Sequence, residues 1–273
     1  MPIEQLPEKR DIFYTSNMNH GSLAQIIFLR QLEALTIADY CITCSKFGIK
    51  FIRENAKLLN KSYTNLIDKK MISMSPPSCL YDGKKKIYHQ KNKLKTFIYN
   101  HRLYKHYGTR TIFEWLTELY TKRKDFNILV TDPTGKRNDE RDRLDKSVVN
   151  FRNWLSGLPF VRVEHIKHHK DYYDVCSECY AGFAPMKPSA LWSMSCVDVL
   201  INGKPLIAPN YACFPEMLDN NQLLLYNDKN DFFKKVERIM DNDDLYVTIS
   251  KHCLKSSKRF TVEEAGNILK TLF

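Results

Sequence analysis

Two cationic side chains, Arg102 and Lys105, follow an apolar stretch at residues 97–99 in the segment YNHRLYKHYGTR, and Arg110 comes shortly after them. Arginine can contact phosphate through two parallel hydrogen bonds, whereas lysine acts as a point charge. Cations and helix N-terminal amides aimed at phosphate oxygens also stabilise a phosphate group as it leaves. The segment therefore predicts a phosphate-binding site. Contacts to a DNA backbone, or a surface ion pair, are the alternatives.

A second informative stretch covers residues 180–218 and reads YAGFAPMKPSALWSMSCVDVLINGKPLIAPNYACFPEML. Its pattern predicts a strand at 181–183, a Pro-marked loop, an apolar helix at 190–201 and a buried strand at 206–208. Gly203 and Pro205 end the helix, because Gly accepts the left-handed conformation and Pro cannot continue a helix. The continuous apolar run at 206–208 suits a parallel strand covered on both faces. Ligands bind beyond the carboxyl ends of such strands, so the loops at 185–195 and 210–214 locate a site.

Asp198 lies on the predicted helix five residues before Gly203, and G-K-P-L-I-A-P at 203–209 precedes a Pro-Glu pair at 215–216. This arrangement resembles the donor-binding end of nucleotide-sugar glycosyltransferases of the GT-B fold, in particular the retaining "group 1" families. The helix of those families reads roughly E-x7-E-A-x3-G-x-P. The resemblance implies that Asp198 accepts hydrogen bonds from the donor ribose hydroxyls. An ordinary strand–helix–strand unit of another Rossmann-like protein is the alternative.

The same resemblance implies that Arg102 and Lys105 are catalytic residues that bind the donor phosphates. Two positions depart from the family pattern. The first acid of the motif falls at Ala190, which has no carboxylate, and Lys105 follows Arg102 by three residues rather than the more usual five.

Five further residues are candidates for the site. Ser193 and Ser195 stand at the start of the predicted helix, where hydroxyl groups and free amides can meet phosphate. His165 follows the third strand of the domain, where the resemblance implies that the base is held. Lys187 is a candidate contact to the diphosphate, with a solvated surface lysine as the alternative. His20, in NMNHGS, is a candidate catalytic residue beside the sugar or acceptor, with a structural histidine as the alternative.

The resemblance implies a UDP-sugar donor substrate and no cofactor. No Asp-x-Asp pair lies plausibly near this site, so we predict no metal ion, and GT-B enzymes generally stabilise the leaving group with cations and dipoles instead. Two Cys-x-x-Cys pairs, Cys41 with Cys44 and Cys176 with Cys179, raise a zinc site as an alternative. The first pair reads as part of a strand, where residues three apart point to opposite faces. We therefore predict core thiols.

Strand and helix candidates alternate regularly from residue 96 onward, which is typical of a doubly wound parallel sheet. Helix, strand and helix candidates at 22–37, 40–43 and 46–59 resemble the closing part of a GT-B N-terminal domain. The predicted fold is therefore α/β and GT-B-like, with an abbreviated acceptor-side domain. Such a domain implies a chain that is either inactive alone or dependent on a partner chain that supplies the missing acceptor part. The predicted boundaries are 1–80 for this N-terminal domain, 81–95 for a basic linker, 96–242 for the nucleotide-sugar-binding Rossmann-like domain, and 243–273 for C-terminal helices.

The formal net charge of +11 is unevenly distributed, because residues 83–113 contain no Asp or Glu. Long cationic side chains neutralise phosphates, and interleaved aromatic rings can stack on bases. We therefore expect this window to bind nucleic acid. A solvated linker is one alternative, and an anionic membrane is another, although the window lacks the apolar face that a membrane helix needs. The predicted nucleic-acid contacts are Lys84, Lys85, Lys86, Lys91, Lys93 and Lys95.

In basic charge and compact size the chain is similar to the DNA-modifying glucosyltransferases of T-even-like phages. This analogy implies transfer of glucose from UDP-glucose to hydroxymethylcytosine or glucosyl-hydroxymethylcytosine in DNA. Such a base must be flipped out of a duplex or reached through a groove. A surface glycan or lipid acceptor is one alternative. A nucleic-acid-binding protein derived from a glycosyltransferase, with its transferase half decayed, is another.

The remaining composition bears on location. The 273-residue chain contains no run of about 18 apolar residues, so no membrane-spanning helix is expected. The first residues, MPIEQLPEKR, contain no signal-peptide core. Eight cysteines without a secretion signal favour reduced thiols in a cytoplasm, which would be the host cytoplasm for a phage protein.

Overall fold

The computed structural model describes residues 21–78, 94–131 and 146–272. Its larger unit contains a six-stranded sheet in which every pair of neighbouring strands is parallel, in the order β5-β4-β3-β6-β7-β8. This confirms the predicted α/β class with a doubly wound parallel sheet. The strands are β3 (Lys95–Tyr99), β4 (Phe126–Thr131), β5 (Val161–Glu164), β6 (Ala181–Phe183), β7 (Leu206–Pro209) and β8 (Leu225–Tyr226).

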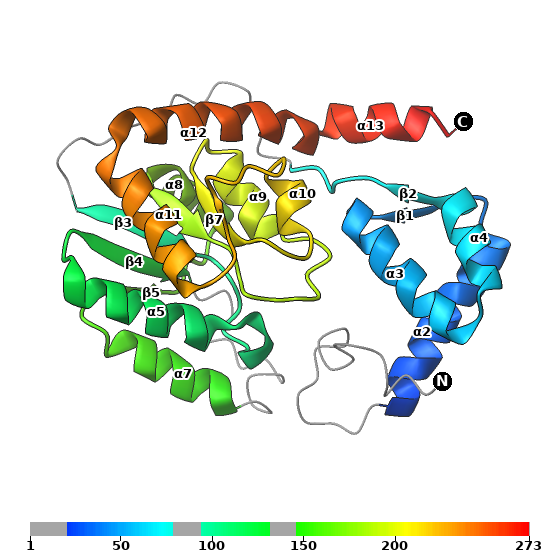
Figure 1. Cartoon of the computed structure of the whole chain (residues 1–273), viewed down its shortest axis with the longest axis horizontal. Helices are drawn as coiled ribbons and strands as arrows, with labels where there is room; N and C mark the ends of the chain where they lie inside the picture. The colour runs from blue at the N-terminus through cyan, green and yellow to red at the C-terminus, as the bar shows by residue number, and fades with distance from the viewer. Residues whose placement is uncertain (1–20, 79–93, 132–145, 273) are drawn as a thin grey trace.

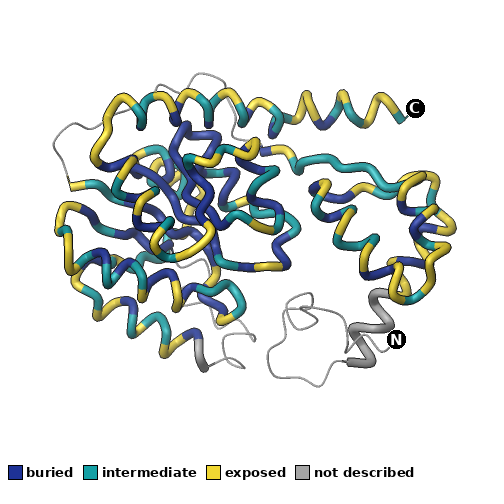
Figure 2. The backbone as a smooth tube through the Cα atoms, viewed as in Figure 1, coloured by how far each residue is buried: buried dark blue, intermediate teal, exposed yellow. Residues whose placement is uncertain are grey.

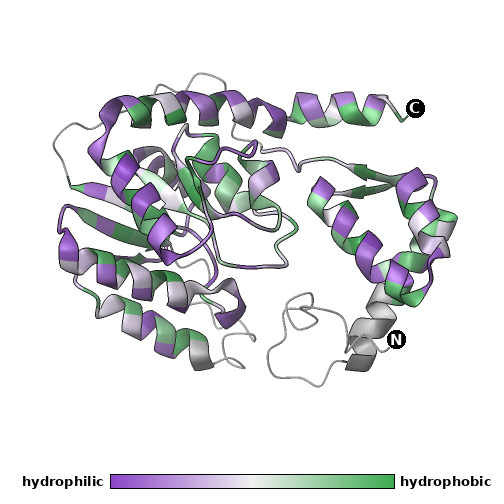
Figure 3. Ribbon diagram, viewed as in Figure 1, coloured by the Kyte–Doolittle hydropathy of each residue, from purple (hydrophilic) through white to green (hydrophobic). Residues whose placement is uncertain are grey.

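Helices cover both faces of this sheet (Figure 1). One face carries α5 (Thr109–Lys122), α7 (Lys146–Ser156) and α11 (Lys229–Asp241), and the other carries α8 (His169–Glu178), α9 (Met194–Leu200) and α12 (Asp243–Ser257). The rings of Trp115 on α5 and Phe232 on α11 lie 5.6 Å apart, which ties the first group together. Since both faces are covered, residues 97–99 of β3 and all of β6 and β7 are buried, as Figure 2 shows, and Figure 3 shows that these central strands are mostly apolar.

The loop after β6 is longer than the sequence predicts. The helix expected at 190–201 begins only at Met194, because Ser193 adopts an extended conformation and its side chain accepts a hydrogen bond from the N–H of Cys196. Residues 190–193 therefore belong to the loop rather than to the helix. At the other end, Gly203 has a φ of 67°, which is the left-handed conformation that the sequence predicts there.

A smaller unit precedes the sheet domain. Strands β1 (Cys41–Thr43) and β2 (Met71–Ser73) pair in parallel, and α2 (Gly21–Ile37), α3 (Lys46–Leu59) and α4 (Ser62–Lys70) pack beside them. The sequence predicts α2, β1 and α3, whereas α4 and β2 were not expected. The buried side chains of this unit are Leu32, Leu35, Ala56 and Ile67, which form a small core of their own.

The segment after β2 leads from the smaller unit to the sheet domain. Residues 74–78 lead out of β2, and the N–H of Ser78 donates a hydrogen bond to the carbonyl of Phe260, with N and O 2.7 Å apart. Phe260 ends the short helix η3 (Lys258–Phe260), which connects α12 to α13 (Val262–Lys270). In Figure 1, α13 extends from the sheet domain toward the smaller unit.

Lys95 is the first residue of β3, although the sequence places it at the end of the basic linker. Its ammonium group donates a hydrogen bond to the carbonyl of Met240 near the end of α11, and lies 5.5 Å from the ring centroid of Tyr180. This is the amino end of the strand, opposite the end where ligands bind. Lys95 therefore has a structural role, because it links β3 to the end of α11. Its contact with DNA stays a sequence-based prediction.

The seven cysteines within the described residues are free thiols, and Cys176 and Cys179 are buried while Cys41 and Cys44 are partly buried. The described residues contain no group of three or more His, Cys, Asp or Glu side chains arranged to hold a metal ion. In the same residues, no helix combines the length and the apolar character required to cross a bilayer.

Candidate active site

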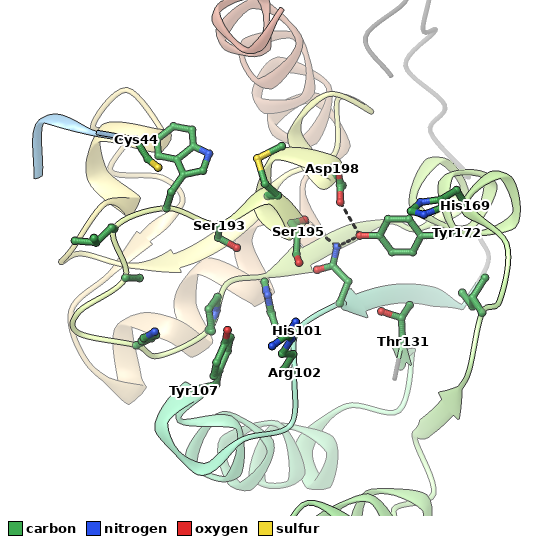
Figure 4. Close-up of a pocket in the computed structure, with 18 of the residues that line it drawn as sticks. Cys44, His101, Arg102, Tyr107, Thr131, His169, Tyr172, Ser193, Ser195 and Asp198 are labelled. Atoms are coloured by element: carbon green, nitrogen blue, oxygen red, sulfur yellow. Dashed lines mark hydrogen bonds between the residues drawn. The ribbon is translucent and has the colours of Figure 1, made fainter. Parts of the chain in front are cut away.

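A cleft of about 1390 Å³ opens beyond the carboxyl ends of the central strands. Its walls come from the loops after β3, β5 and β6, from α8 and α9, and from two residues of the smaller unit, Cys44 and Phe51. The predicted site residues Arg102, His165, Lys187, Ser193, Ser195 and Asp198 all line it. Figure 4 shows this cleft with its labelled side chains. The fold thus brings together residues that lie up to 96 positions apart, as the sequence expects.

Asp198 is held in a hydrogen-bonded chain that joins three elements (Figure 4). The hydroxyl of Tyr172 on α8 donates to Oδ2 of Asp198 at 2.8 Å. Asn100, directly after β3, donates through Nδ2 to the Tyr172 hydroxyl and to the carbonyl of Ser195, both at 2.8 Å. Burial first, and then nearby charges that include Asp198, raise the pKa of Tyr172, so its hydroxyl stays protonated and remains a donor. The chain orients the Asp198 carboxylate before any ligand arrives.

His101 fixes the loop that carries Arg102. The residue is 3% exposed, and Nε2 of its ring lies 2.9 Å from the carbonyl oxygen of Phe183, to which it donates. Burial lowers the pKa of His101 to about 4, because a charged imidazolium is poorly solvated there. The ring is therefore neutral at pH 7, and it ties the end of β3 to its neighbour β6. Arg102, the next residue, is exposed and reaches into the cleft.

Lys105 and Arg110, the other cations of the segment after β3, do not line the cleft. Lys105 lies on η2 (Lys105–Tyr107), is exposed, and is outside the described residues that line the cleft. Arg110 pairs with Glu114 at 3.0 Å and its guanidinium lies 5.5 Å from the ring centroid of Trp154. Asn100, His101 and Tyr107 are the residues of this segment that line the cleft together with Arg102. The catalytic role of Lys105 stays a prediction, without a position in the cleft to support it.

The two candidate serines act differently. Ser193 caps α9, and its side-chain oxygen lies 3.4 Å from the N–H of Cys196. Ser195 lines the cleft and uses its carbonyl to accept the hydrogen bond from Asn100. His165 lies just after β5, next to the cleft-lining residues 166–169. His20 and the predicted nucleic-acid contacts Lys84, Lys85, Lys86, Lys91 and Lys93 lie outside the described residues.

The smaller unit reaches the cleft through the first turn of α3. Ser45, which caps α3, accepts a hydrogen bond from the N–H of Gly48 at 2.9 Å and donates its hydroxyl proton to the carbonyl of Leu191 at 2.7 Å. Leu191 lies in the loop after β6 that lines the cleft. The contact fixes this loop against the smaller unit, beside Cys44.

Sequence reasoning missed three residues of the site: Asn100, Tyr107 and Tyr172. Tyr107 lies in the segment YNHRLYKHYGTR whose cations the sequence analysis singles out, but an uncharged tyrosine there gives no sign of a phosphate contact. Asn100 stands directly after β3, at the strand end where ligands bind. Tyr172 carries no comparable signal, since an aromatic residue on a helix is most often part of the core.

No protein-family model matches this chain, and no curated protein sequence does either. Solved structures do resemble it in fold. Sucrose-phosphate synthase from Thermosynechococcus elongatus has a TM-score of 0.69 at 13% identity, covering 97% of this chain and 64% of that one. HepE from Anabaena, solved with UDP and glucose, has a TM-score of 0.66 at 14% identity, covering 91% and 67%. The pneumococcal O-GlcNAc transferase GtfA, solved with UDP and GlcNAc, has a TM-score of 0.59 at 12% identity, covering 89% and 46%.

This chain therefore spans about half to two thirds of the length of the structures that it resembles. The likeness extends over both units, since each match covers 89% of this chain or more. At identities of 12% to 14%, the likeness shows a shared fold and does not extend to function. The sequence-based prediction of a GT-B-like architecture is confirmed: this chain has the fold of the GT-B glycosyltransferases.

Proposed function

We propose that this chain is a nucleotide-sugar glycosyltransferase that binds a UDP-sugar in the cleft at the carboxyl ends of β3, β5 and β6. The observation that carries the proposal is the pre-oriented Asp198 carboxylate, held by Tyr172 in the same cleft as Arg102. A carboxylate that accepts hydrogen bonds suits ribose hydroxyls, and an arginine suits phosphate. Two structures with a similar fold contain UDP, which supports the choice of nucleotide.

The proposed reaction transfers one glycosyl group. An acceptor hydroxyl oxygen attacks the anomeric carbon, and the bond from that carbon to the β-phosphate oxygen breaks. UDP leaves with the bonding electrons, and the hydroxyl proton passes to solvent or to a base. Arg102 stabilises the charge that develops on the diphosphate, because a guanidinium group can pair with phosphate through two parallel hydrogen bonds. Asp198 positions the nucleotide. We propose that this chemistry needs no cofactor or metal ion besides the UDP-sugar.

The acceptor is a separate question, because a shared fold does not determine it. We keep as a proposal that glucose is transferred to hydroxymethylcytosine or glucosyl-hydroxymethylcytosine in DNA, inside a cytoplasm. The support for it is the +11 charge and the acid-free window at residues 83–113. A surface glycan or lipid is the competing acceptor. We also keep a partner chain on the acceptor side as part of the proposal.

Donor binding is tested first, by titrating UDP calorimetrically into wild type, Asp198→Asn and Arg102→Met. We expect each substitution to weaken UDP binding by about 10- to 100-fold, which is the loss of a hydrogen bond to a charged group. Arg110→Met is the matched control, because Arg110 follows the same strand but pairs with Glu114 outside the cleft lining. Absence of UDP binding by the wild type would overturn the glycosyltransferase proposal.

The acceptor is tested by incorporation of label from UDP-glucose into duplex DNA that contains cytosine, hydroxymethylcytosine or glucosyl-hydroxymethylcytosine. Label in modified DNA alone, lost in Asp198→Asn, is the result expected for a DNA acceptor. No label in any duplex, with UDP binding intact, would exclude these DNA acceptors and favour the glycan or lipid alternative. Repeating the assay with EDTA tests the metal-independent mechanism, which predicts unchanged turnover.

A further inference from the structure

The sequence of α2 carries apolar residues on two sides of the helix, whereas a helix at the surface of a protein usually needs only one apolar side. The first side contains Leu32 and Leu35, which are buried in the small core of the smaller unit. A second stripe recurs in the sequence with the spacing of successive helical turns, and it consists of Leu23, Ile26, Ile27, Ala34 and Ile37. This second stripe lies on the side of the helix away from that core, and we call it the outer surface of α2.

The described part of the outer surface is open to solvent. Ile37 is 80% exposed, Ala34 is exposed, and Leu29 at the flank of the stripe is 43% exposed. Single exposed apolar residues are common, but a group of them on one helix side is typical of an interaction site. The described residues of α2 do not line the cleft, and in Figure 1 α3 rather than α2 is the helix of the smaller unit nearest the sheet domain. The outer surface is therefore separate from the cleft.

Two charged residues, Arg30 and Glu33, are the only ones in the sequence of α2, so the helix has no net charge. Both side chains are exposed, and they pair with each other across 2.7 Å. Nucleic acids and anionic lipids attract surfaces on which lysine and arginine gather. The outer surface of α2 has no such excess of positive charge. A protein surface of matching apolar character is therefore the partner that suits it.

The order of the two charges makes the outer surface complementary to itself. When two identical helices pack antiparallel around a two-fold axis, a residue before the axis in one copy lies opposite a residue after the axis in the other. An axis between residues 31 and 32 sets Arg30 of each copy opposite Glu33 of the other copy. The same register sets position 26 opposite position 37, and both are isoleucine. Charged and apolar positions therefore match in one register.

We propose that the outer surface of α2 binds the same surface of a second copy of this chain, with the two helices antiparallel. The contact is isologous, so it closes on two copies and forms a dimer. Removal of Ile37 and its apolar neighbours from water stabilises the dimer, and the two pairs of Arg30 with Glu33 of the other copy fix the register. This inference does not depend on the proposed function, because the contact uses no described residue of the cleft lining.

Sedimentation equilibrium of the full-length chain over a range of concentrations tests the dimer, with circular dichroism as the check on folding. We expect the wild type to dimerise, and Ile37→Lys to raise the dissociation constant of the dimer by about 10- to 100-fold. Lysine is chosen because the C-terminal end of a helix tolerates a positive charge. Arg30→Glu alone and Glu33→Arg alone are expected to weaken the dimer by a similar factor, because each sets like charges opposite one another.

Mixing the two single charge variants distinguishes contacts between copies from contacts within one helix. A copy with Arg30→Glu presents two acidic residues and a copy with Glu33→Arg presents two basic ones, so an equimolar mixture should form heterodimers with close to wild-type affinity. Glu114→Arg is the matched control, because it sets like charges beside each other on α5, where Arg110 and Glu114 pair 3.0 Å apart. This control should leave the wild-type dimerisation unchanged.

Three results would overturn the proposed dimer. One is a wild type that stays monomeric at the highest soluble concentration. Another is a dimer that Ile37→Lys and Arg30→Glu leave intact, because its contact would then lie elsewhere on the chain. The third is a dimer that both charge variants weaken but that their mixture does not restore, which would contradict the antiparallel register. Dimerisation that appears only after removal of residues 1–20 would also contradict it, since that segment would then cover α2 in the full chain.

Discussion

The carboxylate of Glu216 caps the first turn of a helix in the other unit of the molecule. Its Oε1 accepts a hydrogen bond from the N–H of Lys46 at 2.9 Å, and its Oε2 accepts one from the N–H of Phe47 at 3.1 Å. The first N–H groups of a helix have no partner within it, and the helix dipole favours a negative charge there. Glu216 lies on α10 (Phe214–Met217), directly after β7, so this cap connects the sheet domain to the smaller unit.

Replacing Glu216 with Ala is expected to loosen this connection. Both N–H groups lose their acceptor, so their hydrogen exchange should accelerate and the free energy of unfolding should fall by about 0.5–2 kcal/mol, as for other helix caps. Native-state hydrogen exchange of Lys46 and Phe47 measures the effect directly. Glu114→Ala, which removes a surface partner of Arg110, is the control. Unchanged exchange at both amides would mean that the cap does not hold the two units.

Replacing Tyr172 with Phe is expected to weaken UDP binding by about 3- to 30-fold, which corresponds to about one hydrogen bond. The substitution removes the donor to Asp198 and the acceptor of Asn100, while the ring remains in place. Calorimetric titration of UDP measures the loss. Tyr40→Phe, at an exposed tyrosine of the smaller unit, should leave the affinity unchanged. Equal affinity in wild type and Tyr172→Phe would show that Asp198 needs no positioning, or does not contact the donor.

Protonation of His101 is expected to lower the free energy of unfolding as the pH falls below about 6.5. Its pKa is about 4 in the folded chain, lowered by burial, and about 6.5 in the unfolded chain. The unfolded state therefore binds more protons between these values, so stability is fully present above about pH 6.5 and decreases as the pH falls toward 4. The full difference is at most about 3 kcal/mol.

Comparison of wild type with His101→Gln isolates this contribution. Glutamine keeps a donor for the Phe183 carbonyl but cannot be protonated, so the difference in unfolding free energy between the two proteins should shrink as the pH falls from 7 to 5. Chemical denaturation at a series of pH values measures it. Parallel pH profiles for the two proteins would contradict a neutral, buried imidazole.

Two glycines offer a matched pair of substitutions with opposite expected signs. Gly203→Ala places a Cβ at a φ of 67° and 2.7 Å from Cγ of Leu254, so we expect it to destabilise the protein by about 1–3 kcal/mol. Gly266→Ala lies within α13, and its added Cβ has no heavy atom within 4 Å. There we expect stabilisation of up to about 1 kcal/mol, because Ala has a higher helix propensity than Gly. Thermal unfolding of both variants measures the signs. The same sign for both would contradict the backbone argument at Gly203.

The sequence by itself determined the parts of this protein that depend on local chemistry. The alternation of strands and helices from residue 96 predicts the parallel sheet, because burial on both faces requires continuous apolar strands. Gly203 predicts the end of α9, and the position of Asp198 five residues earlier places its carboxylate in the cleft. Arg102 follows a strand end, and that alone puts it at the ligand-binding edge of the sheet.

Tertiary structure decided which side chains meet. Tyr172 and Asp198 lie 26 residues apart, and Glu216 and Phe47 lie 169 residues apart, so no local spacing reveals either contact. The contact between Lys187 and the Tyr107 ring depends on the packing of the loop after β6 against the loop after β3. These two loops meet because β3 and β6, which are distant in the sequence, are neighbouring strands of the sheet. Sequence patterns report which face of an element is buried. The identity of the partner on that face depends on how the elements pack together, and for this reason Lys105 lies outside the described cleft lining while Lys167 and Lys187 belong to it.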